Sequence, residues 1–153
     1  MSDQLIIYPT PEGGVAIIVP SPEYLQDHTI EELAEKDVPS GITYEIVPAS
    51  SLPSDRTFRN AWEFSTGEVV VDLTKAQEIS VIEAKAQTGE EQQAILDGYT
   101  SEVLAAQAVL PEGSRDPVLQ EKFGEINDLN TELQVKLAAI QSATDVDELY
   151  AII

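Results

Sequence analysis

The sequence predicts an α+β protein in which a small β-rich N-terminal region precedes a helical C-terminal region. Up to Leu73, proline and glycine are frequent and the apolar residues form short β-branched runs, a pattern typical of strands joined by turns. From Thr74 onward, the apolar residues recur at helical spacing instead. We therefore expect two domains: residues 1–73 as a small docking domain, and residues 74–153 as a helix-loop-helix with a short terminal helix.

Four strands and one short helix are expected in the first domain, because strand-forming runs stand between clusters of turn residues. The expected strands are residues 5–8, 15–19, 43–47 and 68–72. The first two flank a Pro/Gly-rich turn, so they should form a β-hairpin. Thr29 and Glu32 match a capping box that opens a short helix to Lys36.

The composition excludes several classes of function. The chain has 28 acidic and 8 basic residues and a net charge of −20, which argues against binding to nucleic acid or to anionic membranes. The charge is spread, with 13 acids and 4 bases in residues 1–76 and 15 acids and 4 bases in residues 77–153. Cysteine is absent, which removes disulfides and thiolate chemistry. The N-terminal residues lack the pattern of a signal peptide or membrane span, so we expect a soluble protein that is not exported by such a signal.

The same inventory predicts no catalytic residues and no bound cofactor or metal. The one histidine, His28, stands beside Asp27 and has no cysteine or second histidine to complete a metal or nucleophile set. No glycine-rich phosphate-binding motif is present. Asp145 and Asp147 come nearest to a calcium-loop spacing, but helix-start charges explain them better. We therefore expect a protein that is not an enzyme.

Residues 55–62, Asp-Arg-Thr-Phe-Arg-Asn-Ala-Trp, combine the single tryptophan with two of the eight basic residues. Helix-start residues open this segment, and one or two helical turns would place Phe58 and Trp62 on one face. Arg59 would then lie beside the aromatic pair, and Arg56 would lie a turn away. These four residues are the candidate interface of the protein.

Two interpretations of this segment are open, and both can hold at once. In the first, Phe58 and Trp62 fill the core of a small sheet, while Asp55 or Glu63 pairs with an arginine. In the second, the arginines dock a neighbouring acidic subunit, because Arg and Trp are over-represented among the residues that dominate interface energies.

The C-terminal region predicts two long helices and a short one. The first long helix starts near Thr74, and Gly89 and Gly98 are candidate breaks in it. The second starts at Asp116, which precedes a first-turn proline. Residues 144–147 can cap a last short helix, whose apolar end we expect to dock onto another surface.

The second long helix carries the strongest periodicity of the chain. Its seam is spaced alternately by four and three residues and consists of Leu119, Phe123, Ile126, Asn130, Leu133, Leu137 and Ile140. Asn130 is the kind of polar seam residue that fixes the register of a coiled coil. Two arrangements are open: the helix folds back on the first long helix as an antiparallel hairpin, or it self-associates with another copy as a short coiled coil.

Several segments follow one another in a recognisable order. They are Leu52-Pro53-Ser54, the block from Asp55 to Trp62, Val70-Val71-Asp72-Leu73-Thr74-Lys75-Ala76 and, more loosely, Thr144-Asp145-Val146-Asp147-Glu148-Leu149. In this order they resemble a family of small structural proteins encoded in tailed-bacteriophage genomes. The chain departs from that family at residues 77–80, which are Gln-Glu-Ile-Ser where the family often has several arginines.

The resemblance implies a virion component rather than an enzyme. Members are similar to proteins found among tail and tail-fibre genes, which implies a tail, baseplate or tail-fibre protein that docks onto other virion proteins and is assembled in the host cytoplasm. A tail-fibre assembly chaperone and a capsid decoration or cement protein are alternatives, and homo-oligomerisation is open. From a different class, the acidity alone suggests an acidic inhibitor or DNA mimic.

Overall fold

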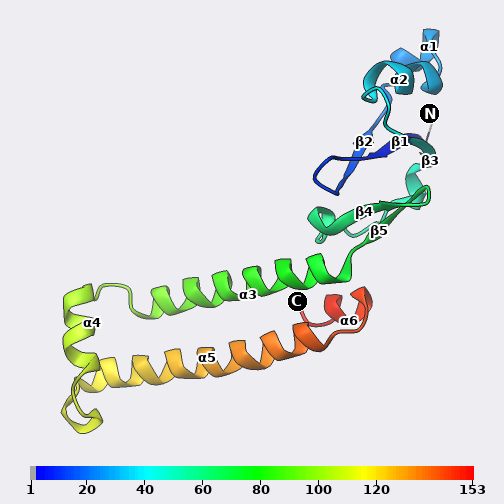
Figure 1. Cartoon of the computed structure of the whole chain (residues 1–153). Coiled ribbons are helices and arrows are strands. Elements are labelled where there is room, and N and C mark those ends of the chain that lie inside the picture. Colours follow the sequence, from blue (N-terminus) through cyan, green and yellow to red (C-terminus); the bar gives the residue numbers. More distant parts are fainter. Residues whose placement is uncertain (1–2) are drawn as a thin grey trace. The chain divides into compact units, whose positions relative to one another are not determined.

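The computed structural model describes residues 3–153, and the chain divides into two compact units with the boundary between Ala76 and Gln77. This boundary lies inside helix α3 (Leu73–Ile95), close to the predicted boundary at Leu73. The N-terminal unit contains the strands and two short helices, while the C-terminal unit is helical (Figure 1). The predicted α+β class is confirmed.

The N-terminal unit is built on a three-stranded antiparallel sheet with the order β2-β1-β3. The strands are β1 (Gln4–Pro9), β2 (Val15–Ile18) and β3 (Glu45–Pro48). In the central strand, Ile7 lies opposite Ile17 of β2 and Glu45 of β3. The predicted hairpin of the first two strands is therefore present, and Gly13 supplies the positive φ of 85° in its turn.

Both faces of this sheet are covered. Successive residues of a strand point to opposite faces, and Ile6 packs against the apolar side of α2 (Ile30–Asp37). On the other face, Ile7 packs against Trp62 and Val69 of a separate β-hairpin. The unit therefore has three layers, a helical layer, a sheet and a hairpin, with β1 buried between the outer two (Figure 1).

Helix α2 begins at the predicted capping box. The Thr29 hydroxyl accepts from the Glu32 backbone N–H at 3.2 Å, and the Glu32 carboxylate accepts from the Thr29 N–H at 2.9 Å. The buried residues of the helix share the i, i+3, i+4 spacing of one helical face and are Ile30, Leu33 and Ala34. A four-residue helix that was not predicted, α1 (Tyr24–Asp27), precedes it.

The third layer is a hairpin of β4 (Trp62–Ser65) and β5 (Glu68–Val71). Its two-residue turn consists of Thr66 and Gly67, whose φ angles are 47° and 84°. Positive φ at both turn positions matches the right-handed twist of the flanking strands, and glycine adopts it without steric cost. Thr66, in contrast, is a β-branched residue in a conformation that disfavours it.

The predicted helix over residues 56–62 is wrong. Trp62 begins β4, and only a short 3-10 turn at Arg59–Ala61 precedes it. The strand prevails because its apolar residues alternate, so that they reach one face and pack on the sheet around Ile7. These alternating residues are Trp62, Phe64, Val69 and Val71.

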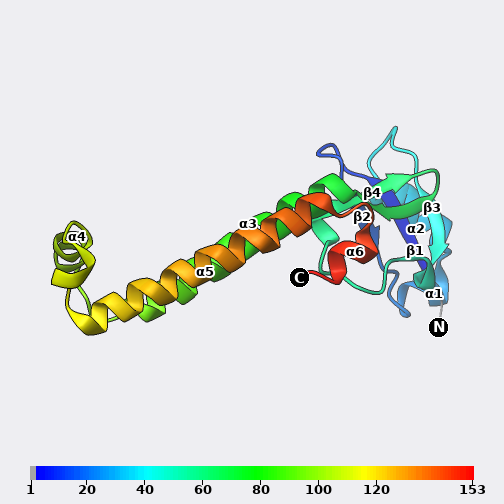
Figure 2. The same ribbon diagram turned by 90° about the horizontal axis from the view of Figure 1, so that it is seen from below.

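The C-terminal unit is an antiparallel helical hairpin, in which the part of α3 after Ala76 runs beside α5 (Pro117–Ser142), as both Figures 1 and 2 show. Helix α4 (Ser101–Ala108) lies between them in the chain. The side-chain hydrogen bonds that join the two long helices include Gln77 to the Ile140 carbonyl at 2.9 Å, Gln92 to Asn130 at 2.7 Å, and Lys122 to the Ile95 carbonyl at 2.8 Å. The seam of α5 therefore pairs with α3 of the same chain.

Helix ends in this unit follow the predicted caps. Asp116 accepts from two backbone N–H groups at the start of α5, and Asp145 accepts from the first turn of α6 (Val146–Tyr150). Gly98 has a φ of 88° shortly after α3 ends, as a helix stop requires. The prediction that Gly89 could break the helix is wrong, because α3 continues through it. A glycine inside a helix costs only about 1 kcal/mol relative to alanine and is tolerated.

Candidate functional site

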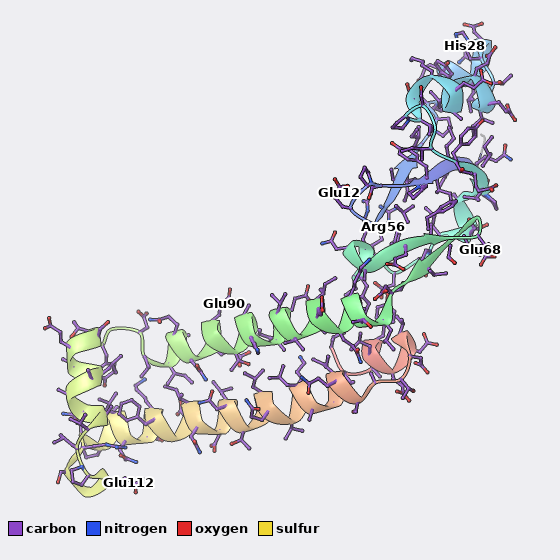
Figure 3. All side chains as sticks on the ribbon, in the orientation of Figure 1. Glu12, His28, Arg56, Glu68, Glu90 and Glu112 are labelled. Carbon is purple, nitrogen blue, oxygen red and sulfur yellow. The ribbon has the colours of Figure 1, made fainter. Side chains whose placement is uncertain are left out.

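The four residues of the candidate interface do not share one surface. Phe58 and Trp62 are buried, with exposed fractions of 0% and 2%. Arg56 and Arg59 are exposed, and Arg56 is labelled in Figure 3. The aromatic side chains therefore belong to the interior, and only the arginines are available to a partner.

Asp55 orders the turn that carries these arginines. Hydrogen bonds from the Thr57 hydroxyl and from the Thr57 backbone N–H lower the pKa of the Asp55 carboxyl, the latter bond measuring 2.8 Å. Glu63, for its part, pairs with Lys75. The prediction that Asp55 or Glu63 pairs with an arginine is therefore wrong, and among residues 3–153 no ion pair holds either arginine of the candidate interface.

An apolar groove lies beside Arg56, and we call it the Arg56 groove. It has a volume of about 520 Å³ and is bordered by β1, by the end of β2 and by the segment that precedes the arginine. The side chains that line it include Leu5, Ile17, Val19, Leu52 and Pro53, together with Arg56. Val19 is 71% exposed, so the groove offers apolar surface to a partner next to a positive charge.

The seam of α5 is covered unevenly. Leu119 and Ile140, near its two ends, are 1% and 0% exposed. The four apolar residues between them are half-buried, and Asn130 is exposed although it bonds to Gln92. The seam is therefore closed at its two ends and partly open in its middle.

A second groove lies on one face of the helical hairpin, and we call it the hairpin groove. It has a volume of about 420 Å³ and lies between the last turns of α3 and the middle of α5. Its apolar lining is Ala94, Ile95 and Leu129, and its carboxylates are Glu91, Glu125, Asp128 and Glu132. A smaller hollow adjoins it and shares Glu91, Leu129 and Glu132.

His28, the single histidine of the chain, has an aromatic and a carboxylate neighbour. His28 stacks on the Tyr24 ring with centroids 4.5 Å apart, and its Nδ1 lies 3.4 Å from a Glu32 oxygen. Over the described part of the chain, no three His, Cys, Asp or Glu residues gather as a metal site would need. No helix in residues 3–153 combines the length and apolar character of a membrane span.

Sequence reasoning missed both grooves, for different reasons. The lining of the Arg56 groove comes from segments far apart in the chain, so no local pattern marks it. The hairpin groove did leave a signal, because Glu125, Asp128 and Glu132 are spaced i, i+3 and i+7 and therefore share one helical face.

Comparison with known proteins adds no relative: no protein-family model matches this chain, and no curated protein or solved structure matches it significantly.

Proposed function

We propose that this protein is a structural component of a tailed-bacteriophage virion, in the tail, baseplate or tail fibre, and that it acts by docking onto other virion proteins. The observation that carries the proposal is that residues 55–62 contain both buried aromatic residues and exposed arginines. Phe58 and Trp62 are committed to the core, while Arg56 and Arg59 stay exposed and have no ion pair among the described residues. The resemblance of residues 52–76 to phage structural proteins supports the same role.

The chemistry of this surface favours an acidic partner. Residues 1–76 carry only 4 basic residues against 13 acidic ones, so two exposed arginines in one short turn form a local positive site on an acidic unit. An arginine fork binds a carboxylate through two parallel hydrogen bonds. The adjoining apolar groove would exclude water from such a contact, which strengthens it.

Mass spectrometry of purified particles tests the proposal. We expect the protein at a fixed ratio to known tail proteins, and immunogold labelling should then locate it on the tail. Absence from purified particles would overturn the proposal and would favour an assembly chaperone, which leaves before the particle is complete. Location on the head would favour a decoration protein instead.

A charge-reversal pair tests the docking surface itself. Arg56→Glu with Arg59→Glu should abolish incorporation into particles while the circular dichroism spectrum stays that of the parent, because both side chains are exposed. The matched control is Lys36→Glu with Lys85→Glu, which changes the net charge equally at two other exposed positions. Equal loss of incorporation in both variants would mean that net charge, and not this surface, governs docking.

A further inference from the structure

The helical hairpin leaves an apolar strip of α5 without full cover. Where the helices face each other, α3 contributes small or polar residues such as Ala84, Thr88 and Gln92. Leu133 of α5 lines the same hollow as Ala84 and Thr88, and both Leu133 and Leu137 stay half-buried. The stabilisation from a leucine rises with the apolar area removed from water, so these half-buried side chains leave apolar area that a partner could still cover.

The hairpin groove adjoins the hollow that Leu133 lines, and it concentrates negative charge around an apolar floor of its own. Four carboxylates, those of Glu91, Glu125, Asp128 and Glu132, border an apolar floor of Ala94, Ile95 and Leu129. No basic residue among the described residues lines the groove. Lys136 lines only the adjoining hollow. Carboxylates on both helices therefore flank one apolar floor, and a cationic ligand with an apolar face complements both features.

We propose that the hairpin groove binds an amphipathic helix of a partner protein, one that is rich in Lys and Arg beside its apolar face. A groove between two helices accepts a third helix, whose ridge of residues at i, i+3, i+4 and i+7 fits between them. Its apolar ridge would cover Ile95 and Leu129, and its basic flanks would face the four carboxylates. This inference rests on the proposed role as a docking protein and specifies the chemistry of one partner.

A second copy of this chain fits the groove poorly. Residues 77–153 carry 15 acidic and 4 basic residues, so two such units would bring like charges together. The groove itself would place four carboxylates of each copy near those of the other. Like-charge contacts of this kind disfavour an interface, so charge favours a cationic helix over self-association.

The test uses the full chain and a synthetic peptide probe of about 21 residues, with leucine on one helical face and lysine elsewhere, about three heptads in length. A second peptide of the same design carries glutamate in place of lysine. We expect saturable one-to-one binding of the lysine peptide and no binding of the glutamate peptide. In nuclear magnetic resonance spectra, the shifts should be confined to residues 84–95 and 125–136.

Two sets of variants distinguish binding of the peptide in the hairpin groove from general electrostatic attraction to an acidic protein. The groove set replaces its carboxylates by amides: Glu91→Gln, Glu125→Gln, Asp128→Asn and Glu132→Gln. The control set removes the same charge at exposed positions outside the groove: Glu83→Gln, Glu90→Gln, Glu102→Gln and Glu121→Gln. Glu90, labelled in Figure 3, lies on the side of α3 that faces away from α5.

The groove set should weaken peptide binding by about tenfold or more, and the control set by less than about threefold. A charge-neutral variant, Leu129→Gln, should also weaken it, because the apolar floor is lost. Equal weakening by the two charge sets, or shifts spread over residues 3–76, would overturn the inference. So would a dimer of the full chain in light scattering that the groove set dissociates. These outcomes are independent of whether the protein is found in particles, so the two proposals fail separately.

Discussion

The side-chain amide of Gln92 on α3 donates a hydrogen bond of 2.7 Å to the side-chain oxygen of Asn130 on α5. Asn130 is the polar member of an otherwise apolar seam. A shift of one helix along the other would separate Asn130 from Gln92 and break this bond. The pair therefore fixes the register of the hairpin within one chain.

A double-mutant cycle of Gln92→Ala and Asn130→Ala should give a coupling energy of about 0.5 kcal/mol, the low end for a hydrogen bond, because Asn130 is exposed. Urea denaturation followed by circular dichroism measures it. The coupling should be the same at low and high protein concentration, since both residues belong to one chain. A coupling that appears only at high concentration would instead place the contact between two copies.

The turn of the β4–β5 hairpin predicts two opposite effects. Thr66→Asn should raise the free energy of unfolding by about 0.5–1 kcal/mol, because asparagine tolerates the positive φ of 47° that a β-branched residue resists. Gly67→Ala should lower it by about 1 kcal/mol, because φ there is 84°. Thermal unfolding monitored by Trp62 fluorescence reports both. Equal effects of the same sign would contradict a type I′ turn.

Substitutions of the buried Trp62 should lower the free energy of unfolding by different amounts. Trp62→Ala should cost about 3–5 kcal/mol through lost burial and a cavity. Trp62→Phe should cost less, because it keeps most of the apolar contact and removes an indole N–H that is buried without an acceptor among the described residues. Urea denaturation followed by circular dichroism measures both variants.

A matched control for Trp62 lies on the surface of the same unit. Val19 is 71% exposed, so Val19→Ala should stay within about 0.5 kcal/mol of the parent. If Trp62→Phe proved as costly as Trp62→Ala, the indole N–H would have to be making a bond that stabilises the fold.

The sequence was informative wherever local patterns decide the structure. Caps at Thr29, Asp116 and Asp145 mark helix starts correctly, because each side chain bonds to a backbone N–H within three residues of itself. The prediction of a helix at residues 56–62 was wrong because a long-range contact, and not a local pattern, decides the structure there. Helical spacing of Phe58 and Trp62 is a weak signal, and packing of Trp62 on the central sheet, a long-range contact, overrides it.

The docking surfaces also depend on contacts between residues far apart in the chain, which local sequence patterns do not predict. The exposed arginines of the first unit could be singled out by residue type, but the apolar groove beside Arg56 depends on Leu5, Ile17 and Leu52, which only the fold brings together. In the second unit, the seam of α5 predicts a helical partner without saying which one. The choice of α3 follows from bonds such as Gln92 to Asn130, which connect positions 38 residues apart.

Asp55 predicts a pH dependence whose sign is fixed by its hydrogen bonds. Since bonds from Thr57 lower the pKa of Asp55 in the folded chain, this carboxylate stabilises the fold above its unfolded pKa. That contribution is lost as the pH falls through the lower, folded pKa. Carbon-detected titration of the Asp55 carboxyl should therefore give a midpoint below the ordinary value for aspartate.

Two variants of Thr57 test the cause of this pKa. Thr57→Val removes the hydroxyl donor but keeps the backbone N–H, so the Asp55 midpoint should rise toward, without reaching, its ordinary value. Thr57→Ser keeps both donors and should leave the midpoint close to that of the parent. If valine and serine shift the midpoint equally, the hydroxyl is not the larger cause, and the backbone bond alone orders the turn that presents Arg56.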